Sequence, residues 1–389
     1  MNWGYLLLEL KMAKTIYLIA GEASGDFLGA GLIKALKTLS PDVNIIGIGG
    51  SLMETEGLSS LFPMQELSLM GLTEVLPHAL HILKRIRQTA DDIVQKKPDV
   101  VVTIDSPGFC LRVAKKIKDK TSIPIVHYVA PSVWAWREGR AQKLAAKVDH
   151  LLTLFPFEPP YFEKYNLPTT FVGHPLTEQT IKSDPTFRNH HKIPENAIVL
   201  SILPGSRMGE INKLLPIFIE TAELLSKKIK DLHLVFPTLP HLAPILSKTL
   251  KGTKLTYTLV TSITEKYAAF FASDAALAAS GTVSLELAFA NLPMVIAYKV
   301  SFLTYFIIKK LVKIRNVCLI NILLGKTVVD EKLQKDCTAD QLTAALEKIL
   351  NSKGREMKPH LLEATKRLYP LTSDSPSSVA AKVILEHCS

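Results

Sequence analysis

Short apolar runs alternate with helical patterns along the first half of the chain. The runs that predict strands lie at 15–20, 43–48, 99–104, 124–129, 150–155 and 170–172. Helical patterns fill most of the intervals, for example 27–39 and 81–95. Alternation of this kind predicts an α/β domain with a parallel sheet that is covered by helices on both faces.

A polar stretch at 177–196 interrupts this alternation, which then begins again. The next predicted strand, 198–203, runs into the sequence LPGSRMGEINKLL, and further strands are predicted at 232–236, 254–260, 274–279 and 293–297. We therefore expect two doubly wound, Rossmann-like domains in tandem, at 12–180 and 190–370. Ligands of such sheets bind at the carboxyl ends of the strands, so a cleft between the domains is the expected site.

Length and charge narrow the classes of partner. A chain of 389 residues with 47% hydrophobic side chains can bury two cores. The net charge of +10 favours an anionic partner, which could be nucleic acid, an acidic lipid surface or a phosphorylated substrate. The basic residues form short, dispersed clusters outside any nucleic-acid motif, so we do not expect nucleic acid as the partner.

Four separated cysteines without a C-x-x-C pair are typical of a reduced cytosolic protein and do not suggest a zinc site. The first 14 residues, MNWGYLLLELKMAK, lack the pattern of a signal peptide, and Met12 is an alternative start. No uncharged apolar run is long enough to span a bilayer. The sequence thus predicts a soluble protein.

The stretch IAGEASGDFLG at 19–29 reads as a strand end, a turn of small residues and a helix start. A helix N-terminus can bind phosphate. This turn, however, has neither the P-loop nor the dinucleotide spacing, and Glu22 and Asp26 would repel an anion. The residues alone do not say what its glycines are for.

Two turns in the second half suit phosphate better. Arg207 follows a strand and a Gly-Ser turn, where a guanidinium could neutralise a diphosphate. The alternative is a surface arginine whose turn only needs Gly205. The run 280–282, Ser-Gly-Thr, repeats the arrangement, with ordinary N-capping as its alternative. Glu286 shares a helical face with Thr282, and periodicity alone would make it a solvated charge.

Asp105 ends a very apolar strand and precedes Ser-Pro-Gly. An acid at the carboxyl end of such a strand points into the ligand site of a parallel sheet. The alternative role is an N-cap for the following helix, a common use of aspartate. Residue type alone favours the cap.

Several segments together resemble the lipid A disaccharide synthase family. They are GEASGDFLGAGLIKAL, IDSPGF, HYVAPSVWAWREGR, FPFE with FVGHPL, LPGSR and ASGTVSLELA, in the family's order from about Lys14 to the C-terminus. GEASGD and SVWAW are specific to that family, whereas LPGSR and SGT occur more widely in related glycosyltransferases.

The resemblance implies a glycosyltransferase-B fold of two facing Rossmann-like domains, with a final helix, about 372–389, returning to the first. It implies an inverting transfer of 2,3-diacylglucosamine from UDP to 2,3-diacylglucosamine 1-phosphate, giving a β-1,6-linked disaccharide and UDP. No essential metal or other cofactor is implied. The expected location is cytoplasmic, at the inner face of the cytoplasmic membrane. A homodimer is possible, and the sequence does not decide the oligomeric state.

The resemblance also assigns roles to residues. It makes Asp105 the general base, since an inverting transfer needs one group to take the acceptor proton. The residues expected to bind the UDP-sugar are Ser206, Arg207, Ser280, Gly281 and Thr282. Glu286 is expected to accept hydrogen bonds from the ribose hydroxyls. Asn321 is expected at the nucleotide, although the family's Leu-Pro-Asn reads Leu-Ile-Asn here.

The GEASGD turn is then expected near the sugar. This place explains its negative charge, because a carboxylate accepts hydrogen bonds from sugar hydroxyls. Glu22 would bind sugar hydroxyls or the acceptor, with Ser24 and Gly25 beside it, and Asp26 would cap the following helix. Weaker candidates for the acceptor site or cleft wall are His127, Trp136, Arg137 and His174. For Trp136 a core position is the alternative, and for His174 a structural role.

An amphipathic segment at 69–88 could dip into an anionic membrane interface. The residues concerned are Leu72, Val75, Leu76, Leu80, Leu83, Lys84 and Arg85. A core-packed helix with a solvated charged face is the alternative. A second apolar and basic stretch, 301–315, could contact the membrane, form a dimer contact or pack in the core.

Two other functions compete with this one. Another glycosyltransferase-B enzyme, such as a UDP-sugar epimerase or the murein-pathway transferase, lacks GEASGD and SVWAW. A binding protein that kept the fold without the chemistry would be expected to lose Glu22, Asp105, Arg207 and Glu286, which are all present.

Overall fold

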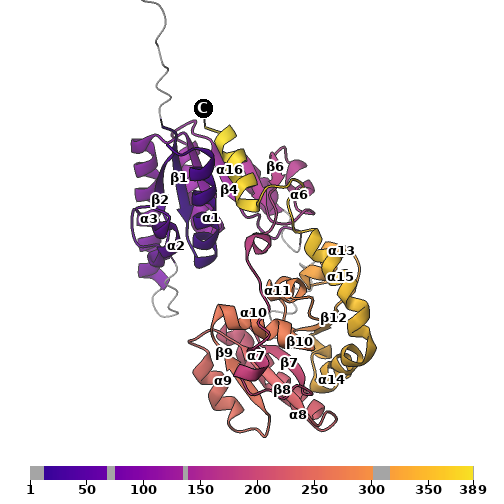
Figure 1. Cartoon of the computed structure of the whole chain (residues 1–389). Coiled ribbons are helices and arrows are strands. Elements are labelled where there is room, and N and C mark those ends of the chain that lie inside the picture. Colours follow the sequence, from indigo (N-terminus) through magenta and orange to yellow (C-terminus); the bar gives the residue numbers. More distant parts are fainter. Residues whose placement is uncertain (1–12, 68–74, 135–138, 301–315, 389) are drawn as a thin grey trace, which may run out of the picture. The chain divides into compact units, whose positions relative to one another are not determined.

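The computed structural model describes residues 13–67, 75–134, 139–300 and 316–388 (Figure 1). The chain divides into two compact units. The first comprises Met1–Glu178 together with Tyr369–Ser389, and the second comprises Gln179–Leu368. Each unit contains one six-stranded sheet in which every strand pair is parallel.

The first sheet has the order β2-β1-β3-β4-β5-β6. Its strands are β1 (Thr15–Ala20), β2 (Asn44–Ile48), β3 (Val100–Ile104), β4 (Ile125–Tyr128), β5 (His150–Thr153) and β6 (Thr169–Phe171). β3 is buried along its whole length, as expected for a strand with helices on both sides. β1 lies between β2 and β3, so the turns after β1 and β3 are neighbours.

Helices cover both faces of this sheet (Figure 1). They are α1 (Ala23–Leu39), α2 (Ser51–Thr55), α3 (Val75–Lys96), α4 (Pro107–Lys118), α5 (Gly139–Ala145), α6 (Pro160–Glu163) and α16 (Pro376–Glu386). One core cluster joins α1 and α16 to the sheet through residues such as Leu32 and Ile384. A second joins α3 and α4 to it through residues such as Ile93 and Val113.

The second sheet has the order β12-β11-β10-β7-β8-β9. Its strands are β7 (Ile198–Leu203), β8 (Leu232–Pro237), β9 (Tyr257–Val260), β10 (Ala275–Ala279), β11 (Met294–Tyr298) and β12 (Asp330–Leu333). Its helices are α7 (Phe187–His190), α8 (Met208–Ser226), α9 (Ala243–Leu250), α10 (Ile263–Ala272), α11 (Val283–Phe289), α13 (Leu319–Leu324), α14 (Ala339–Lys348) and α15 (Gly354–Lys366).

The doubly wound α/β fold predicted from the sequence is confirmed. The differences are local. β9 is shorter than the predicted 254–260, α3 begins before the predicted 81, and β12 was not predicted. β12 reads Asp-Glu-Lys-Leu, is half-buried and, among the described strands, pairs only with β11 at the edge of its sheet, so it lacks the apolar signal of a central strand.

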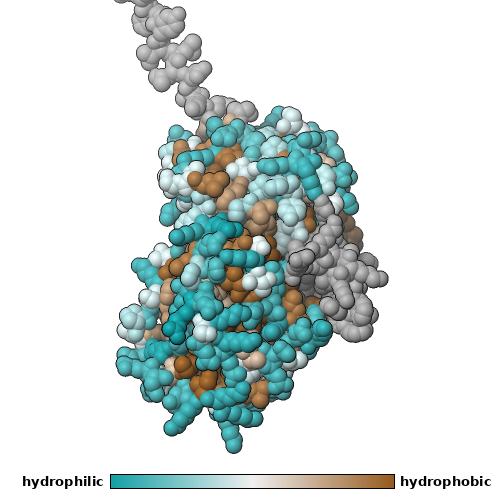
Figure 2. All heavy atoms as spheres, turned by 90° about the vertical axis from the view of Figure 1, so that its right-hand side faces the viewer, coloured by the Kyte–Doolittle hydropathy of each residue, from teal (hydrophilic) through white to brown (hydrophobic). Residues whose placement is uncertain are grey.

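None of the helices in the described ranges is long and apolar enough to cross a membrane. On the face shown in Figure 2, hydrophilic residues cover most of the described surface, with hydrophobic residues in small groups among them. Exposed large hydrophobic side chains include Leu80 and Leu83 on α3.

Candidate active site

The turn after β1 packs directly against the turn after β3. A Cβ on Gly21 would lie 2.6 Å from the Ser106 hydroxyl, and a Cβ on Gly25 would lie 3.2 Å from the Ile104 carbonyl oxygen. Since real Cβ atoms do not approach other atoms within 3.0 Å, Gly21 is required by this contact. The glycines of GEASGD therefore bring two strand-end turns together.

These two turns present a cluster of carboxylate and hydroxyl groups. The Ser24 hydroxyl donates to Asp105 Oδ2 at 3.2 Å, and the Ser106 hydroxyl donates to Glu22 Oε1 at 3.3 Å. Glu22 and Ser24 are exposed, while Asp105 and Ser106 are half-buried. Two carboxylates thus lie in one polar cluster at the carboxyl edge of the first sheet.

Asp105 and Ser106 are both left-handed, with φ of 52° and 44°. Two such residues in succession are costly for L-amino acids other than glycine, and strain of this kind concentrates at functional sites. The N-cap of α4 is Ser106, so Asp105 precedes the cap position. The alternative in which Asp105 serves as the helix cap is therefore wrong.

The position of Asp26 corrects a further expectation. Its carboxylate is buried and accepts hydrogen bonds from three backbone N–H groups, those of Gly50 at 2.8 Å, Leu52 at 3.1 Å and Met53 at 3.0 Å. These groups begin α2, and Asp26 lies in the first turn of α1. Asp26 therefore caps the short helix α2 instead of its own helix.

Two histidines expected at the acceptor site lie in the interior instead. His127 is 1% exposed, its Nδ1 lies 2.7 Å from the Thr103 hydroxyl, and burial lowers its pKa to about 4. His174 is 6% exposed, its Nδ1 accepts from the Leu176 N–H, and burial lowers its pKa to about 4. This burial favours the structural role for both imidazoles, and their contact with the acceptor stays a prediction. Trp136 and Arg137 lie outside the described residues.

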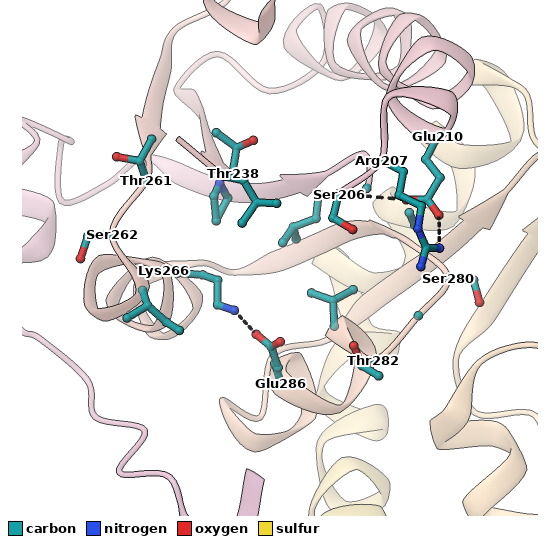
Figure 3. Close-up of a pocket in the computed structure, with 18 residues that line it drawn as sticks. Ser206, Arg207, Glu210, Thr238, Thr261, Ser262, Lys266, Ser280, Thr282 and Glu286 are labelled. Atoms are coloured by element: carbon teal, nitrogen blue, oxygen red, sulfur yellow. Dashed lines mark hydrogen bonds and ion pairs between the residues drawn. The ribbon is translucent and has the colours of Figure 1, made fainter. Parts of the chain in front are cut away.

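The second unit contains a pocket of about 490 Å³ (Figure 3). Its walls come from the segments that follow β7, β8, β9 and β10, four strands that are adjacent in the sheet. The pocket lies where ligands of parallel sheets bind, and its volume suits a small molecule. Its polar lining residues are Ser206, Arg207, Glu210, Thr238, Thr261, Ser262, Lys266, Ser280, Thr282 and Glu286.

The turn after β7 brings Arg207 and a carboxylate into the same wall. Arg207 is the N-cap of α8, and 83% of its side chain is exposed. Glu210 accepts from the Ser206 N–H at 3.2 Å and lies 3.6 Å from Arg207 Nη1. Gly205 has a φ of 119°, and a Cβ there would lie 2.5 Å from Glu210 Oε2. The glycine thus makes room for the carboxylate of Glu210.

The turn after β10 contributes two hydroxyls. Ser280 donates to the Val317 carbonyl oxygen at 3.1 Å. Thr282 is the N-cap of α11 by position, but its side chain caps no N–H group. A Cβ on Gly281 would meet nothing within 4 Å, so this glycine faces open space. The hydroxyl of Thr282 is consequently not used as an ordinary helix cap.

Glu286 forms an ion pair across the pocket. Lys266 of α10 directs its ammonium group at the Glu286 carboxylate of α11 (Figure 3). The Lys266 side chain is 25% exposed and the Glu286 side chain 17%. The alternative of a solvated helix charge for Glu286 is therefore wrong, since this carboxylate lies largely within the protein and has a cationic partner.

Asn321 does not contribute a free polar group. It is fully buried on α13, its Nδ2 donates to Val329 O and Glu331 Oε1, and its Oδ1 accepts from the Val328 and Val329 N–H groups. These four bonds use the two donors and two acceptor positions of a side-chain amide. The expected nucleotide contact is corrected, because Asn321 instead anchors the segment that leads into β12.

The expected membrane segment is described in part. Leu80 is 66% exposed and Leu83 50%, and Lys84 is exposed beside them. Arg85 instead forms a bidentate pair with Glu66, in which Nε and Nη2 each donate at 2.8 Å. It is thus held by the protein, which corrects its assignment as a lipid contact. Leu72 and the side chains of Val75 and Leu76 lie outside the described residues.

Lys266 and Glu210 were not predicted from the sequence. Each pairs with a predicted residue, and Glu210 was within reach of sequence reasoning because it lies three residues after Arg207. The pairing of Lys266 with Glu286 depends on the relative placement of α10 and α11, and no spacing in the sequence reports it.

Residues 16–383 match the model of a family described as lipid-A-disaccharide synthetase. A lipid-A-disaccharide synthase from Paramagnetospirillum magneticum is 46% identical over 378 residues, which cover 95% of this chain and 97% of that one. One from Rhodospirillum centenum is 46% identical over 340 residues, covering 86% and 85%, and one from Rickettsia typhi is 42% identical over 379, covering 95% and 98%.

Solved structures resemble the fold at low sequence identity. The S. aureus MnaA-UDP co-structure has a TM-score of 0.64 and 15% identity, over 96% of this chain and 95% of that one. Acinetobacter baumannii MurG has a TM-score of 0.60 and 13% identity, over 96% and 100%. These likenesses show the glycosyltransferase-B fold.

Proposed function

The chain belongs to the lipid-A-disaccharide synthetase family, and we propose that it joins two acylated glucosamines in lipid A biosynthesis. The donor is UDP-2,3-diacylglucosamine and the acceptor is 2,3-diacylglucosamine 1-phosphate. The acceptor 6-hydroxyl oxygen attacks C1 of the donor sugar, the bond from C1 to the UDP oxygen breaks, and inversion gives the β-1,6 linkage. UDP leaves with the bonding electrons.

The observation that carries this proposal is the pocket of the second unit. An exposed guanidinium, that of Arg207, lies at the start of α8, beside the Ser206 N–H and across from Ser280 and Thr282. A guanidinium and N–H groups stabilise the charge that develops on a leaving diphosphate. The half-buried carboxylate of Glu286 in the same pocket is an acceptor for ribose hydroxyls.

The acceptor chemistry is assigned to the first unit. Asp105 takes the proton of the attacking hydroxyl, and Ser24 orients its carboxylate through the 3.2 Å hydrogen bond. Glu22, which is exposed in the adjacent turn, binds sugar hydroxyls. The two left-handed residues at 105 and 106 support this assignment, because they hold the carboxylate outside the helix-capping position.

Membrane association belongs to the same proposal. The substrates carry acyl chains, and the exposed leucines of α3, Leu80 and Leu83, lie beside the exposed Lys84. Together with the net charge of +10, this surface suits an anionic bilayer interface. The proposed location is therefore cytoplasmic, at the inner face of the cytoplasmic membrane.

The test is a transfer assay with defined substrates. The purified chain is incubated with both acylated substrates, and the product is identified by mass spectrometry. We expect one tetraacyl disaccharide 1-phosphate for each UDP released, and no UDP release when the acceptor is omitted. Arg207→Ala should lower turnover by about two orders of magnitude or more, and Arg207→Lys should recover only part, because an ammonium lacks the bidentate fork.

The competing enzyme classes give different products. An epimerase would interconvert UDP-N-acetylglucosamine without an acceptor, and a murein-pathway transferase would use UDP-N-acetylglucosamine as donor. Either activity, in the absence of disaccharide formation from the acylated pair, would contradict the proposal. UDP binding with no turnover of any of these substrates would favour the other alternative, a binding protein that has the fold but no catalytic activity.

A further inference from the structure

Lys266 is the second cation of the pocket and has no role in the function proposed above. It lies on α10, in the segment that follows β9, and its ammonium group reaches Glu286 on α11. Figure 3 shows that both side chains point into the pocket and toward each other. The two helices follow different strands, so the pair fixes one wall of the pocket relative to the other.

The two oxygens of the Glu286 carboxylate lie in different surroundings. Oε2 has lost its exposure to solvent, and among the described residues Lys266 Nζ is the group that pairs with it. Oε1 takes part in no described hydrogen bond or ion pair. A carboxylate held in this way through one oxygen presents the other to a ligand, because rotation about its terminal bond would break the ion pair.

The ammonium group of Lys266 also contacts an aromatic ring. Its ammonium nitrogen lies 4.9 Å from the ring centroid of Tyr267, within the range of a cation–π contact. The Tyr267 hydroxyl donates to Gln179 Oε1 at 2.9 Å, and the Tyr267 residue is 9% exposed. The ammonium group therefore contacts both a ring held by this hydrogen bond and the carboxylate that it orients.

We propose that Lys266 is a positioning residue for nucleotide recognition, which turns Oε1 of Glu286 toward the ribose hydroxyls. It thereby sets the preference of the pocket for a ribonucleotide over a nucleotide that lacks these hydroxyls. This inference rests on the proposed function, since it takes Glu286 as the ribose acceptor. Lys266 acts through Glu286 and does not contact the reacting atoms.

Two simpler roles give different results in binding experiments. A lysine that only attracts an anionic ligand would affect every uridine diphosphate equally, whatever its sugar. A lysine that only stabilises the fold would affect the melting temperature and leave the sugar preference unchanged. The ratio of affinities for two nucleotides that differ only in the ribose hydroxyls separates these roles from positioning.

The experiment measures dissociation constants for UDP and 2′,3′-dideoxy-UDP by titration calorimetry. The affinity of wild type should be about ten- to a hundredfold higher for UDP than for 2′,3′-dideoxy-UDP. Hydrogen bonds from the ribose hydroxyls to a charged acceptor produce a difference of this size. In Lys266→Met and in Lys266→Gln the ratio should fall below about threefold, mainly through weaker UDP binding. Lys266→Arg, which keeps the charge, should retain most of the preference.

A matched control comes from α8. Lys213 is exposed, lies outside the pocket lining and forms no ion pair with a described residue. Lys213→Met removes the same charge from the same unit, and its ratio should equal that of wild type. Melting temperatures of all variants are measured on the same preparations.

The outcomes separate this inference from the function that it rests on. If Lys266→Met and Lys266→Gln weaken the binding of both nucleotides by the same factor, the wild-type ratio of affinities is kept, Lys266 acts only as a charge and the inference is overturned. If Glu286→Gln keeps the wild-type ratio, the assignment of Glu286 to the ribose fails. If Glu286→Gln loses the preference and both Lys266 variants keep it, the proposed function stands without the role for Lys266.

Discussion

Glu210 contacts two groups that a bound phosphate would need. Its carboxylate accepts from the Ser206 N–H at 3.2 Å and lies 3.6 Å from the Arg207 guanidinium. The side chain is 17% exposed, so its charge is only partly screened by solvent. Burial raises the pKa of the nearby Tyr298 hydroxyl, and the charge of Glu210 adds to this effect. A diphosphate at Arg207 would therefore meet a competing carboxylate.

We predict that Glu210→Gln strengthens UDP binding about threefold to tenfold. The glutamine keeps the acceptor oxygen for the Ser206 N–H. It removes the repulsion between the Glu210 carboxylate and the diphosphate, which is worth about 1 kcal/mol at this kind of site. Glu220→Gln, an exposed position on the same helix, is the matched control and should leave the affinity unchanged. Weaker UDP binding in Glu210→Gln would mean that the charge holds Arg207 in place for the ligand.

Glu158 is a buried carboxyl group outside both sites. It is 3% exposed and accepts from the Phe155 N–H at 3.1 Å and from the Trp134 indole N–H at 3.3 Å. Burial raises its pKa from 4.5 to about 7, because these two bonds do not offset the loss of solvation. The folded state therefore binds this proton more tightly than the unfolded state does.

The sign of the resulting pH dependence follows from linkage. The stabilisation that comes from protonated Glu158 is complete below about pH 4.5 and is lost as the pH rises to about 7, a change of about 3 kcal/mol. Glu158→Gln stays neutral, so its melting temperature relative to wild type should rise between pH 5 and pH 8. Glu163→Gln, at an exposed position on α6, should show no such trend. A parallel pH profile for wild type and Glu158→Gln would contradict the raised pKa.

At the scale of elements, the sequence predicted what depends on periodicity and strand ends. β1 and β7 were predicted to the residue, because long apolar runs bounded by glycine turns leave little ambiguity. The turns after β1, β3, β7 and β10 were identified as the places where polar chemistry gathers, and the structure places them at the carboxyl edges of the two sheets.

What the sequence did not predict depends on packing between distant segments. Asp26 reads as a cap for the helix that contains it, yet the loop at Gly50 folds back and takes the carboxylate. Asn321 reads as a free polar side chain, yet β12 and the residues just before it use its whole amide. Arg85 reads as a surface cation, yet Glu66, 19 residues away, binds it. Residue type cannot reveal a partner that only the fold supplies.

α3 offers a test of membrane association with variants that spare the core. Leu80→Gln combined with Leu83→Gln should weaken association with anionic liposomes about tenfold, because each leucine no longer transfers apolar surface into the interface. The melting temperature should stay unchanged, since both side chains are at least half exposed. The control replaces Leu362 and Leu371, two other exposed leucines, by glutamine. Equal liposome binding by the α3 variant, the control and wild type would show that α3 is not part of the membrane-binding surface.

At the scale of the whole molecule, the first unit is built from both ends of the chain. α16 packs on α1 (Figure 1), and Ala380, Ala381 and Ile384 belong to the same core cluster as Leu32. Ser377 donates to Glu178 through its N–H and its hydroxyl. Residues 369–389 are therefore part of the folding of the first unit.

Truncation after residue 368 should accordingly destabilise only the first unit. Hydrogen exchange followed by mass spectrometry should show loss of amide protection in β1 and α1, because their apolar face loses its cover. Peptides from β7 to β10 should keep wild-type protection and serve as the internal control. Unchanged protection of α1 in the truncated chain would show that α16 is dispensable for this core.

Catalysis, as we propose it, needs Asp105 of the first unit to take a proton while the second unit binds UDP. Asp105→Asn tests this directly, because asparagine keeps the size, tolerates the left-handed conformation and cannot accept the proton. The measurement is kcat with both acylated substrates, with UDP affinity and melting temperature determined on the same preparation. We expect turnover to fall by about two to four orders of magnitude, with affinity and stability close to wild type. Near-normal turnover in Asp105→Asn would contradict the account.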